Sequence, residues 1–335
     1  MGPRLYFYCE LDTPVLKILL EDGRIFNTLQ KLHAGVCLST LDFSSERAEI
    51  VKSFTQAGIP VTAWLLLPKS QGYWSNIENA SQTQARYAEL KTWTMQHNLQ
   101  WSAIGLDIEP NIQLLQLLLA RHWTALFPSL LKSITPGRIS KASQIYKNLI
   151  ERIRADGYML ETYQLPLIAD DRLAHSKMIQ RLLEIVDLPS DREVLMLYSS
   201  FIRPWGAGIL WSYGQNSKAL GIGSAGGGVE LPGENRYPLT WDEFQRDLSL
   251  AWACSEYIYI FSLEGCHQQG FLDRLVNFEW DQLILEPIDA SRRVDRLRLS
   301  FQVFSWIFSH YYFFLGFGFI IALLLYPRKR KKGKS

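Results

Sequence analysis

The sequence alternates short apolar runs with helical patterns eight times over residues 1–285. Such runs, bounded by turn residues, are typical of buried parallel strands. Eight strand–helix repeats over about 280 residues are the usual make-up of a closed barrel. We therefore predict an α/β fold, a (β/α)8 TIM barrel over 1–285, with a doubly wound open sheet as the alternative. The expected strands are residues 5–11, 35–42, 60–67, 101–110, 159–165, 193–199, 219–223 and 257–264.

Composition supports a packed core and excludes some functions. Hydrophobic residues make up 47% of the chain and charged residues 20%, which argues against disorder. The formal net charge is +2, but the tail 327–335 holds six basic side chains, so the remaining chain is mildly acidic and nucleic-acid binding is not expected. Four scattered cysteines, without a CxxC pair or a histidine at ligand spacing, predict neither a metal site nor a disulfide framework, and no cofactor is expected.

The fourth run, Trp101–Pro110, ends in two acids. Alternate side chains of a strand point to opposite faces, so Asp107 and Glu109 share one face. Pro110 has no amide hydrogen to donate, which places Glu109 at the carboxyl end of the strand. Two carboxyl groups on an apolar strand lower the stability of the fold unless they form ion pairs or contact solvent, so their presence can also indicate a functional role. A helix cap with a salt bridge is the alternative to a functional site.

In a barrel, the carboxyl ends of all strands meet at one rim, where active sites of this architecture lie. Acids follow several of the predicted strands, and polar or aromatic side chains accompany them. Core packing is the alternative interpretation of the aromatic residues. We expect the catalytic residues to be Asp107, Glu109 and Tyr198. The expected substrate-binding residues are Glu10, Asp42, Trp64, Tyr163, Met196 and Glu264.

Two short motifs resemble a known family. Leu106-Asp107-Ile108-Glu109 resembles the second half of the family-18 chitinase signature, DxxDxDxE, and Met196-Leu197-Tyr198 is similar to that family's Met-x-Tyr. The resemblance implies that Glu109 protonates the leaving glycosidic oxygen. It also implies that Asp107 supports the N-acetyl group of the substrate, which acts as the nucleophile, and that Tyr198 contacts this group.

The chain departs from the family at several positions. Ser102 and Gly105 stand where the signature has its earlier acids, and Ala103 replaces its glycine. The eighth strand carries no tryptophan, and Phe261 is the nearest ring. Asp-x-Glu on a fourth strand also occurs in other barrel glycosidases, including lysozyme-type muramidases. The resemblance therefore implies a TIM-barrel glycoside hydrolase rather than a chitinase.

Elementary electrostatics agrees with a glycosidase acting on a β-linked glycan, with an N-acetylated glycan as the narrower expectation. The charge of Asp107 raises the pKa of Glu109 and stabilises an oxocarbenium-like transition state. A retaining mechanism with two carboxylates would need a second acid close to the first, for which Glu10 or Glu264 is available. The sequence does not decide between this mechanism and the one in which the N-acetyl group of the substrate is the nucleophile. A non-catalytic carbohydrate-binding or scaffold barrel at a membrane is the first alternative function.

The second alternative is a barrel enzyme on a phosphorylated small molecule, suggested by the GxGxxG pattern at Gly221–Gly226. A dinucleotide site is rejected, because Pro232, Gly233 and Pro238 prevent the helix that should follow this motif. The glycines then form either a flexible rim loop or a phosphate cradle, since barrels often bind phosphate near strands seven and eight.

Residues 299–326 carry no formal charge and are long enough, as a helix, to cross a hydrocarbon core of ~30 Å. We predict a transmembrane helix here, contacting the lipid bilayer, between a basic juxtamembrane linker at 286–298 and a basic tail at 327–335. The expected localisation is a membrane, with a single-pass C-terminal anchor. By the positive-inside rule, the six basic residues of the tail favour an orientation with the tail in the cytoplasm. No amino-terminal signal peptide is apparent, and both a cytoplasmic and an exported barrel remain open.

Overall fold

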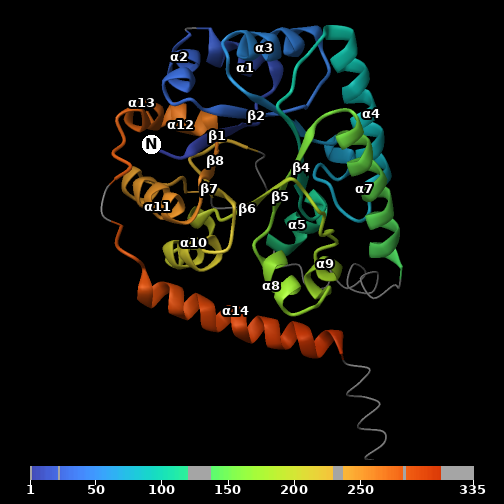
Figure 1. The fold of residues 1–335 in the computed structure, drawn as a ribbon, viewed down its shortest axis with the longest axis vertical. Coiled ribbons are helices and arrows are strands. Elements are labelled where there is room, and N and C mark those ends of the chain that lie inside the picture. Colours follow the sequence, from blue (N-terminus) through green and yellow to red (C-terminus); the bar gives the residue numbers. More distant parts are fainter. Residues whose placement is uncertain (1, 22, 120–136, 229–236, 282–283, 311–335) are drawn as a thin grey trace, which may run out of the picture.

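Eight parallel strands close into a barrel in chain order (Figure 1). The structure is a computed structural model and describes residues 2–21, 23–119, 137–228, 237–281 and 284–310. β1 pairs with β8 as well as with β2, and Tyr6 lies opposite Tyr259, so the sheet has no open edge. The predicted barrel is confirmed. The strands are β1 Arg4–Cys9, β2 Gly35–Ser39, β3 Val61–Leu65, β4 Ala103–Ile108, β5 Met159–Gln164, β6 Arg192–Met196, β7 Ala219–Gly223 and β8 Tyr257–Phe261.

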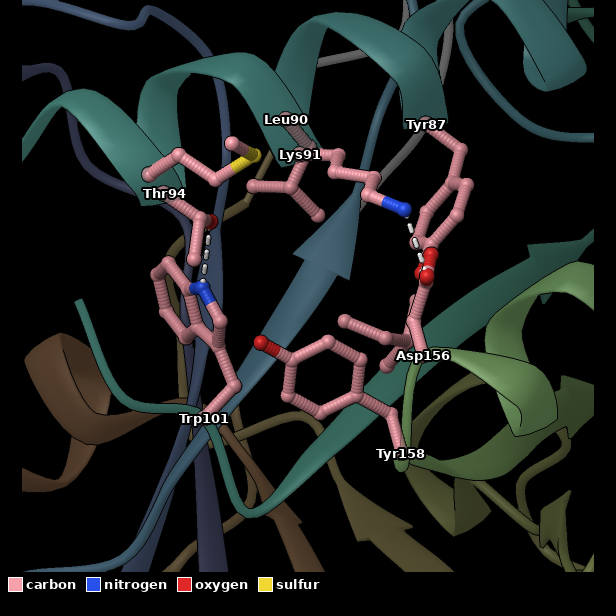
Figure 2. A pocket seen from close by; sticks show the side chains of 9 residues that line it. Tyr87, Leu90, Lys91, Thr94, Trp101, Asp156 and Tyr158 are labelled. Atoms are coloured by element: carbon pink, nitrogen blue, oxygen red, sulfur yellow. Dashed lines mark hydrogen bonds and ion pairs between the residues drawn. The ribbon is translucent and has the colours of Figure 1, made fainter. Parts of the chain in front are cut away.

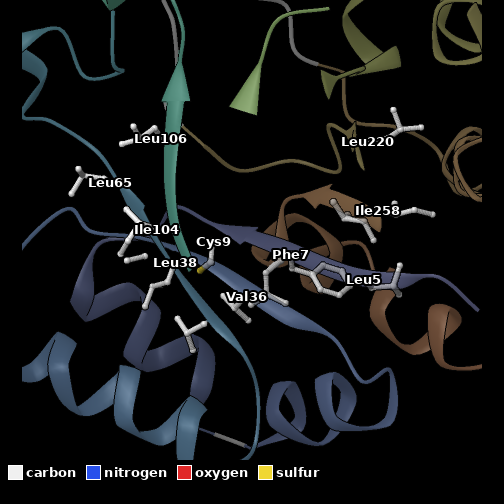
Figure 3. Close-up of a cluster of buried hydrophobic side chains, with 14 of the residues drawn as sticks. Leu5, Phe7, Cys9, Val36, Leu38, Leu65, Ile104, Leu106, Leu220 and Ile258 are labelled. Carbon is white, nitrogen blue, oxygen red and sulfur yellow. The ribbon is translucent and has the colours of Figure 1, made fainter. Parts of the chain in front are cut away.

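The outward side chains of the strands form the apolar layer on which the helices pack. Leu5, Phe7, Val36, Leu106 and Ile258 are at most 2% exposed and belong to one cluster (Figure 3). Both faces of a parallel barrel sheet are covered, which explains why the strands appear in the sequence as continuous apolar runs rather than as alternating ones. The burial of this layer holds the helices against the barrel.

The helices follow the strands around the outside of the barrel (Figure 1). Local signals fix several helix starts: the Ser44 hydroxyl accepts a hydrogen bond from the Arg47 amide, and Thr240 forms a capping box with Glu243. The helices are α1 Thr13–Leu20, α2 Arg24–Lys31, α3 Ser45–Gln56, α4 Ala80–His97, α5 Ile112–Leu119, α7 Arg138–Ala155, α8 Leu167–Leu173, α9 Met178–Leu182, α10 Gly206–Gly214, α11 Trp241–Cys254, α12 Leu263–Gln268, α13 Phe271–Val276 and α14 Ile288–Ser309, with the 3-10 turns η1 Lys69–Gln71 and η3 Ser199–Phe201.

Three helical segments differ from the pattern in the sequence. The apolar pattern over 14–32 would fit a single helix, but the chain forms α1 and α2, with Gly23 between them at a left-handed φ of 70°. The pattern over 169–186 would also fit one helix, but it is divided between α8 and α9. The segment around Trp211, which has no clear pattern in the sequence, contains α10.

The C-terminal helix α14 crosses the predicted boundary between linker and membrane span. It runs from Ile288 to Ser309 along the outside of α8 and α10 (Figure 1). The reason is a buried carboxylate on α8, Asp170, which accepts hydrogen bonds from Arg298 and Gln302 of α14. Among the described residues, no helix is both long and apolar enough to cross a membrane. Residues 311–326 of the predicted span lie outside the described residues.

Candidate active site at the carboxyl end of the barrel

The inward side chains of the strands fill the barrel in layers. An inner cluster, separate from the outer apolar layer, is rich in aromatic rings. Towards the amino ends of the strands lies a charged pair, Glu161 of β5 and Arg192 of β6. Towards the carboxyl ends, β4 presents Asp107. The rings between them come from four strands: Tyr8, Trp64, Tyr163, Tyr259 and Phe261.

Asp107 is the most deeply buried acid at the carboxyl end of β4. It is 2% exposed, whereas Glu109, just beyond the end of the strand, is half-buried. Burial raises the pKa of Asp107 well above its usual range, and the negative charges of Glu109 and Glu10 raise it further. A hydrogen bond to Glu109 also favours the protonated form. The carboxyl group of Asp107 therefore holds its proton to higher pH than an ordinary carboxyl group.

Several buried polar atoms around Asp107 lack hydrogen-bond partners. Within the described part of the chain, these include Asp107 Oδ1, Trp64 Nε1 and the Tyr8 hydroxyl. The indole of Trp64 opposes the rise in the pKa of Asp107, although its Nε1 has no hydrogen-bond partner among the described residues. Buried polar atoms are usually paired, and unpaired ones cost free energy. Other buried polar atoms of the described chain also lack partners, among them the Thr62 hydroxyl and the Gln164 amide, but those around Asp107 lie beside the acids at the carboxyl end, where a polar ligand could complete their hydrogen bonds.

Two further acids lie beside this pair. Glu10, which follows β1, accepts a short hydrogen bond from the Tyr73 hydroxyl. Glu264 was expected at the end of the eighth strand but lies in the first turn of α12. Its Oε1 accepts a hydrogen bond of 3.4 Å from the Glu10 amide, and its Oε2 is buried without a partner in the described chain. Burial raises the pKa of Glu264, so this carboxyl group also favours its neutral form.

Tyr198 and Met196 extend the site along β6. Met196 belongs to the inner cluster and is 7% exposed, and Tyr198 follows the strand. Burial raises the pKa of Tyr198, and the negative charges of Asp107 and Glu109 raise it further. The Tyr198 ring lies 5.5 Å from that of Phe261, between centroids. The structure therefore brings together Asp107, Glu109, Tyr198, Glu10 and Trp64.

Two other predicted site residues, Asp42 and Tyr163, form hydrogen bonds with residues away from Asp107. Asp42 accepts hydrogen bonds from Thr13 and Ser44 and pairs with the buried Arg47 at 3.1 Å. Burial alone would raise the pKa of Asp42, but the hydrogen bonds from Ser44 and Thr13 lower it to about 2. These contacts tie the end of β2 to α1 and α3. Tyr163 lies deep in the barrel, where its hydroxyl donates to Glu161 at 3.1 Å.

Sequence reasoning missed the charged pair inside the barrel. Glu161 is 1% exposed and accepts hydrogen bonds of 2.8 Å from both Arg192 and the Tyr259 hydroxyl. The available signal was a Glu inside an apolar run and an Arg at the start of the next. The same layer explains Gly105, which stands where the chitinase signature has an acid: a Cβ there would lie 2.3 Å from the Tyr163 hydroxyl.

The glycine-rich loop after β7 lies against acids rather than free amides. A Cβ on Gly227 would lie 2.6 Å from Glu264 Oε1, and one on Gly228 would lie 3.0 Å from Glu10 Oε2. Phosphate binding beside two carboxyl groups is electrostatically unfavourable. The loop therefore packs on the candidate site and gives no support to a phosphate cradle. Among the described residues, no cluster of three or more His, Cys, Asp or Glu could hold a metal ion.

A cavity of about 120 Å³ lies outside the barrel, beside the start of β4 (Figure 2). Trp101 and Tyr158 line it, and several of its polar groups pair with one another. The Tyr87 hydroxyl donates to Asp156 at 2.8 Å, and Lys91 forms an ion pair with the same carboxylate. It does not contain the unpaired atoms found around Asp107, and we assign it no part in the candidate site.

Comparisons with known proteins show the fold but not the family. No protein-family model and no curated protein matches the sequence. Similar solved structures include the PgaB (BpsB) glycoside hydrolase domain from Bordetella bronchiseptica, with 9% identity and a TM-score of 0.51 over 84% of this chain and 100% of that chain. A GH18 chitinase from Pseudoalteromonas aurantia has 10% identity and a TM-score of 0.48 over 82% and 100%. A tryptophan synthase α-subunit mutant from Pyrococcus furiosus has 14% identity and a TM-score of 0.41 over 83% and 98%. At these identities, the likeness to the PgaB domain shows that this chain shares its barrel fold.

Proposed function

We propose that the protein hydrolyses or transfers a β-linked glycan by acid/base catalysis at the carboxyl end of the barrel, with an N-acetylated glycan as the preferred substrate. The observation that supports this most strongly is the pair on β4. Asp107 is buried, with a raised pKa and an unpaired oxygen, while Glu109 stands beside it with more access to solvent. Two carboxyl groups with different environments can divide acid and base roles between them.

In this proposal, Glu109 protonates the leaving glycosidic oxygen, because it lies at the open end of the strand. Asp107 shares its proton with Glu109 and, once ionised, stabilises the positive charge that develops on the sugar ring. Tyr198 positions the group that reacts, and Trp64 and Phe261 supply apolar walls. Glu10 and Glu264 are the acids available to a two-carboxylate retaining mechanism.

A non-catalytic carbohydrate-binding barrel is the second candidate. It is favoured by Gly105, whose position beside Tyr163 leaves no space for the acid of the chitinase signature. The unpaired polar atoms around Asp107 would then bind a sugar without turning it over. Both candidates share the site and differ only in whether Glu109 transfers a proton.

The test is turnover of a panel of β-linked glycans by the wild-type protein and by Glu109→Gln, which keeps the shape and removes the proton. We expect turnover to fall by ~10²–10⁴ while glycan binding persists. Glu89→Gln, on the exposed surface of α4, is the matched control and should leave turnover unchanged. Binding without turnover in the wild-type protein would support the binding module. Full activity in Glu109→Gln would move the chemistry to another acid, and Glu264→Gln would be the next variant to test.

A further inference from the structure

Helix α14 differs from an ordinary surface helix, because much of its inward face is polar and much of its outward face is apolar. A helix on a water-soluble domain buries apolar residues and exposes polar ones. Val294 and Phe301 of α14 pack against the apolar core, but the side chains that form hydrogen bonds with the rest of the protein are polar: Asp295, Arg298, Gln302, Ser305 and Ser309. Their spacing of three or four residues defines a single face.

The inward face is held by hydrogen bonds to the barrel. Asp170 of α8 is fully buried and accepts from Arg298 at 3.0 Å and from Gln302 at 2.8 Å. Its neighbour Asp171 accepts from Ser305 at 3.0 Å. These bonds fix the rotation of α14 about its own axis. Which side chains face away from the barrel is therefore determined by the docking.

The outward face is apolar over the second half of the helix. Leu299, Val303, Phe304 and Ile307 are 61%, 52%, 58% and 44% exposed. Single exposed apolar residues are normal, but a continuous row that includes an aromatic ring marks a contact with an apolar medium or partner. These four residues are called the outer apolar row below.

The positively charged side chains next to the outer apolar row favour an anionic lipid surface as its partner. Arg292, Arg293 and Arg296 are exposed on the preceding turns, and Asp295, the only acid between 292 and 310, accepts a hydrogen bond from Ser212 of the barrel. Two copies meeting through this face would bring arginines together. An anionic lipid surface offers phosphates to the arginines and acyl chains to the apolar row. The uncharged sequence of 311–326 continues from the same end of the helix.

We infer that the outer apolar row of α14 lies in the headgroup–acyl boundary of an anionic lipid bilayer, with the arginines at the phosphates. Because α14 is bonded to α8 and α10, the barrel itself rests on the lipid surface in one orientation rather than hanging from a flexible linker. The inference is independent of the proposed chemistry.

The experiment uses the full chain with Cys254→Ser, which removes the partly accessible native thiol. Spin labels are attached at Phe304→Cys and Ile307→Cys, and at the control Met95→Cys, which is 73% exposed on α4. Accessibility to oxygen and to a water-soluble nickel chelate is measured with phosphatidylcholine vesicles that contain or lack phosphatidylserine. Circular dichroism confirms that each variant is folded.

We expect both α14 labels to lose accessibility to the nickel chelate and gain accessibility to oxygen on phosphatidylserine-containing vesicles, while the label at 95 stays in water. The pair Arg292→Glu and Arg296→Glu should weaken this protection, and Lys141→Glu on α7 should not. Failure to bind these vesicles, or labels at 304 and 307 that remain as accessible to the chelate as the label at 95, would overturn the inference. Protection that rises with protein concentration in the absence of vesicles would assign the face to a second copy instead.

Discussion

The two ends of the barrel interior hold buried acids in opposite circumstances. At the amino end, Glu161 has every partner it needs in Arg192, Tyr259 and Tyr163. At the carboxyl end, the buried Asp107 has an unpaired oxygen and lies near two more acids. Burial raises the pKa of both groups, but only Glu161 has a cation that opposes the rise.

This difference separates a structural network from a candidate site. A buried charge that is paired and fully hydrogen-bonded is consistent with packing alone. A buried acid that is surrounded by like charges and unpaired donors lowers stability unless something else selects for it, and such groups cluster at functional sites. The comparison therefore predicts that substitutions at the two ends change stability in opposite directions.

The largest effect on stability is expected at the amino end. Arg192→Met leaves the carboxylate of Glu161 buried without its cation, and should lower the free energy of unfolding by about 3–5 kcal/mol. Arg154→Met, which breaks an exposed ion pair with Asp191, should cost at most about 1 kcal/mol. Chemical denaturation of both variants measures the difference. Equal losses would show that the Glu161–Arg192 pair is not a structural network.

A matched pair of Tyr→Phe substitutions sharpens the comparison. The Tyr259 hydroxyl donates to Glu161 and accepts from Arg192, so Tyr259→Phe should cost about 1.5–3 kcal/mol. The buried Tyr8 hydroxyl has no partner among the described residues, so Tyr8→Phe should change stability by about 0.5 kcal/mol or less. The same denaturation experiment compares them. A large loss in Tyr8→Phe would mean that this hydroxyl is structurally paired and is not available to a ligand.

The contrast also predicts a pH dependence of stability of opposite sign at Asp107 and Asp42. The pKa of Asp107 is raised in the folded protein, so its contribution to stability falls as pH rises from its unfolded value of about 3.9 through the folded one. Asp107→Asn should therefore gain stability relative to wild type over that window, by about 1.4 kcal/mol for every pH unit that separates the unfolded pKa from the folded one.

Asp42 provides the control for this pH dependence. Its folded pKa is about 2, so its contribution is present above about pH 3.9 and is lost as pH falls toward 2. Asp42→Asn should be less stable than wild type at neutral pH and approach it in acid. Unfolding measured across pH for both variants checks the two signs. Parallel pH curves for the two variants would contradict the contrast.

The barrel could be predicted from the sequence because parallel strands buried on both faces leave apolar runs that are visible without an alignment. The parity of Asp107 and Glu109 followed from the same rule and needed no structure. Which side chains meet inside the barrel depends on strand tilt and register, and these do not appear in a single sequence. For that reason, the pairing of Glu161 with Arg192 and the unpaired Tyr8 hydroxyl were not predicted.

The contacts of Asp42 and of α14 also could not be predicted from the sequence. Asp42 follows a strand, as the other acids do, but Arg47 and Ser44 in the next turn bind it, and their local hydrogen bonds compete with any role at the rim. The segment 286–298 has the composition of a basic linker, yet Arg298 bonds to a buried carboxylate 128 residues earlier in the chain. Composition describes the charge of a segment but not the partners that the fold brings to it.

In the proposed function, a bound glycan forms hydrogen bonds with the buried polar atoms at the carboxyl end of the barrel that have no partner among the described residues. The most direct test is a crystal structure of Glu109→Gln soaked with a β-linked N-acetylated oligosaccharide, since this variant should bind without turnover. We predict that a sugar oxygen or amide lies within hydrogen-bond distance of Asp107 Oδ1, with the ring near Trp64 and Tyr198. An oligosaccharide bound elsewhere on the barrel, or an empty carboxyl end at saturating ligand, would contradict the account.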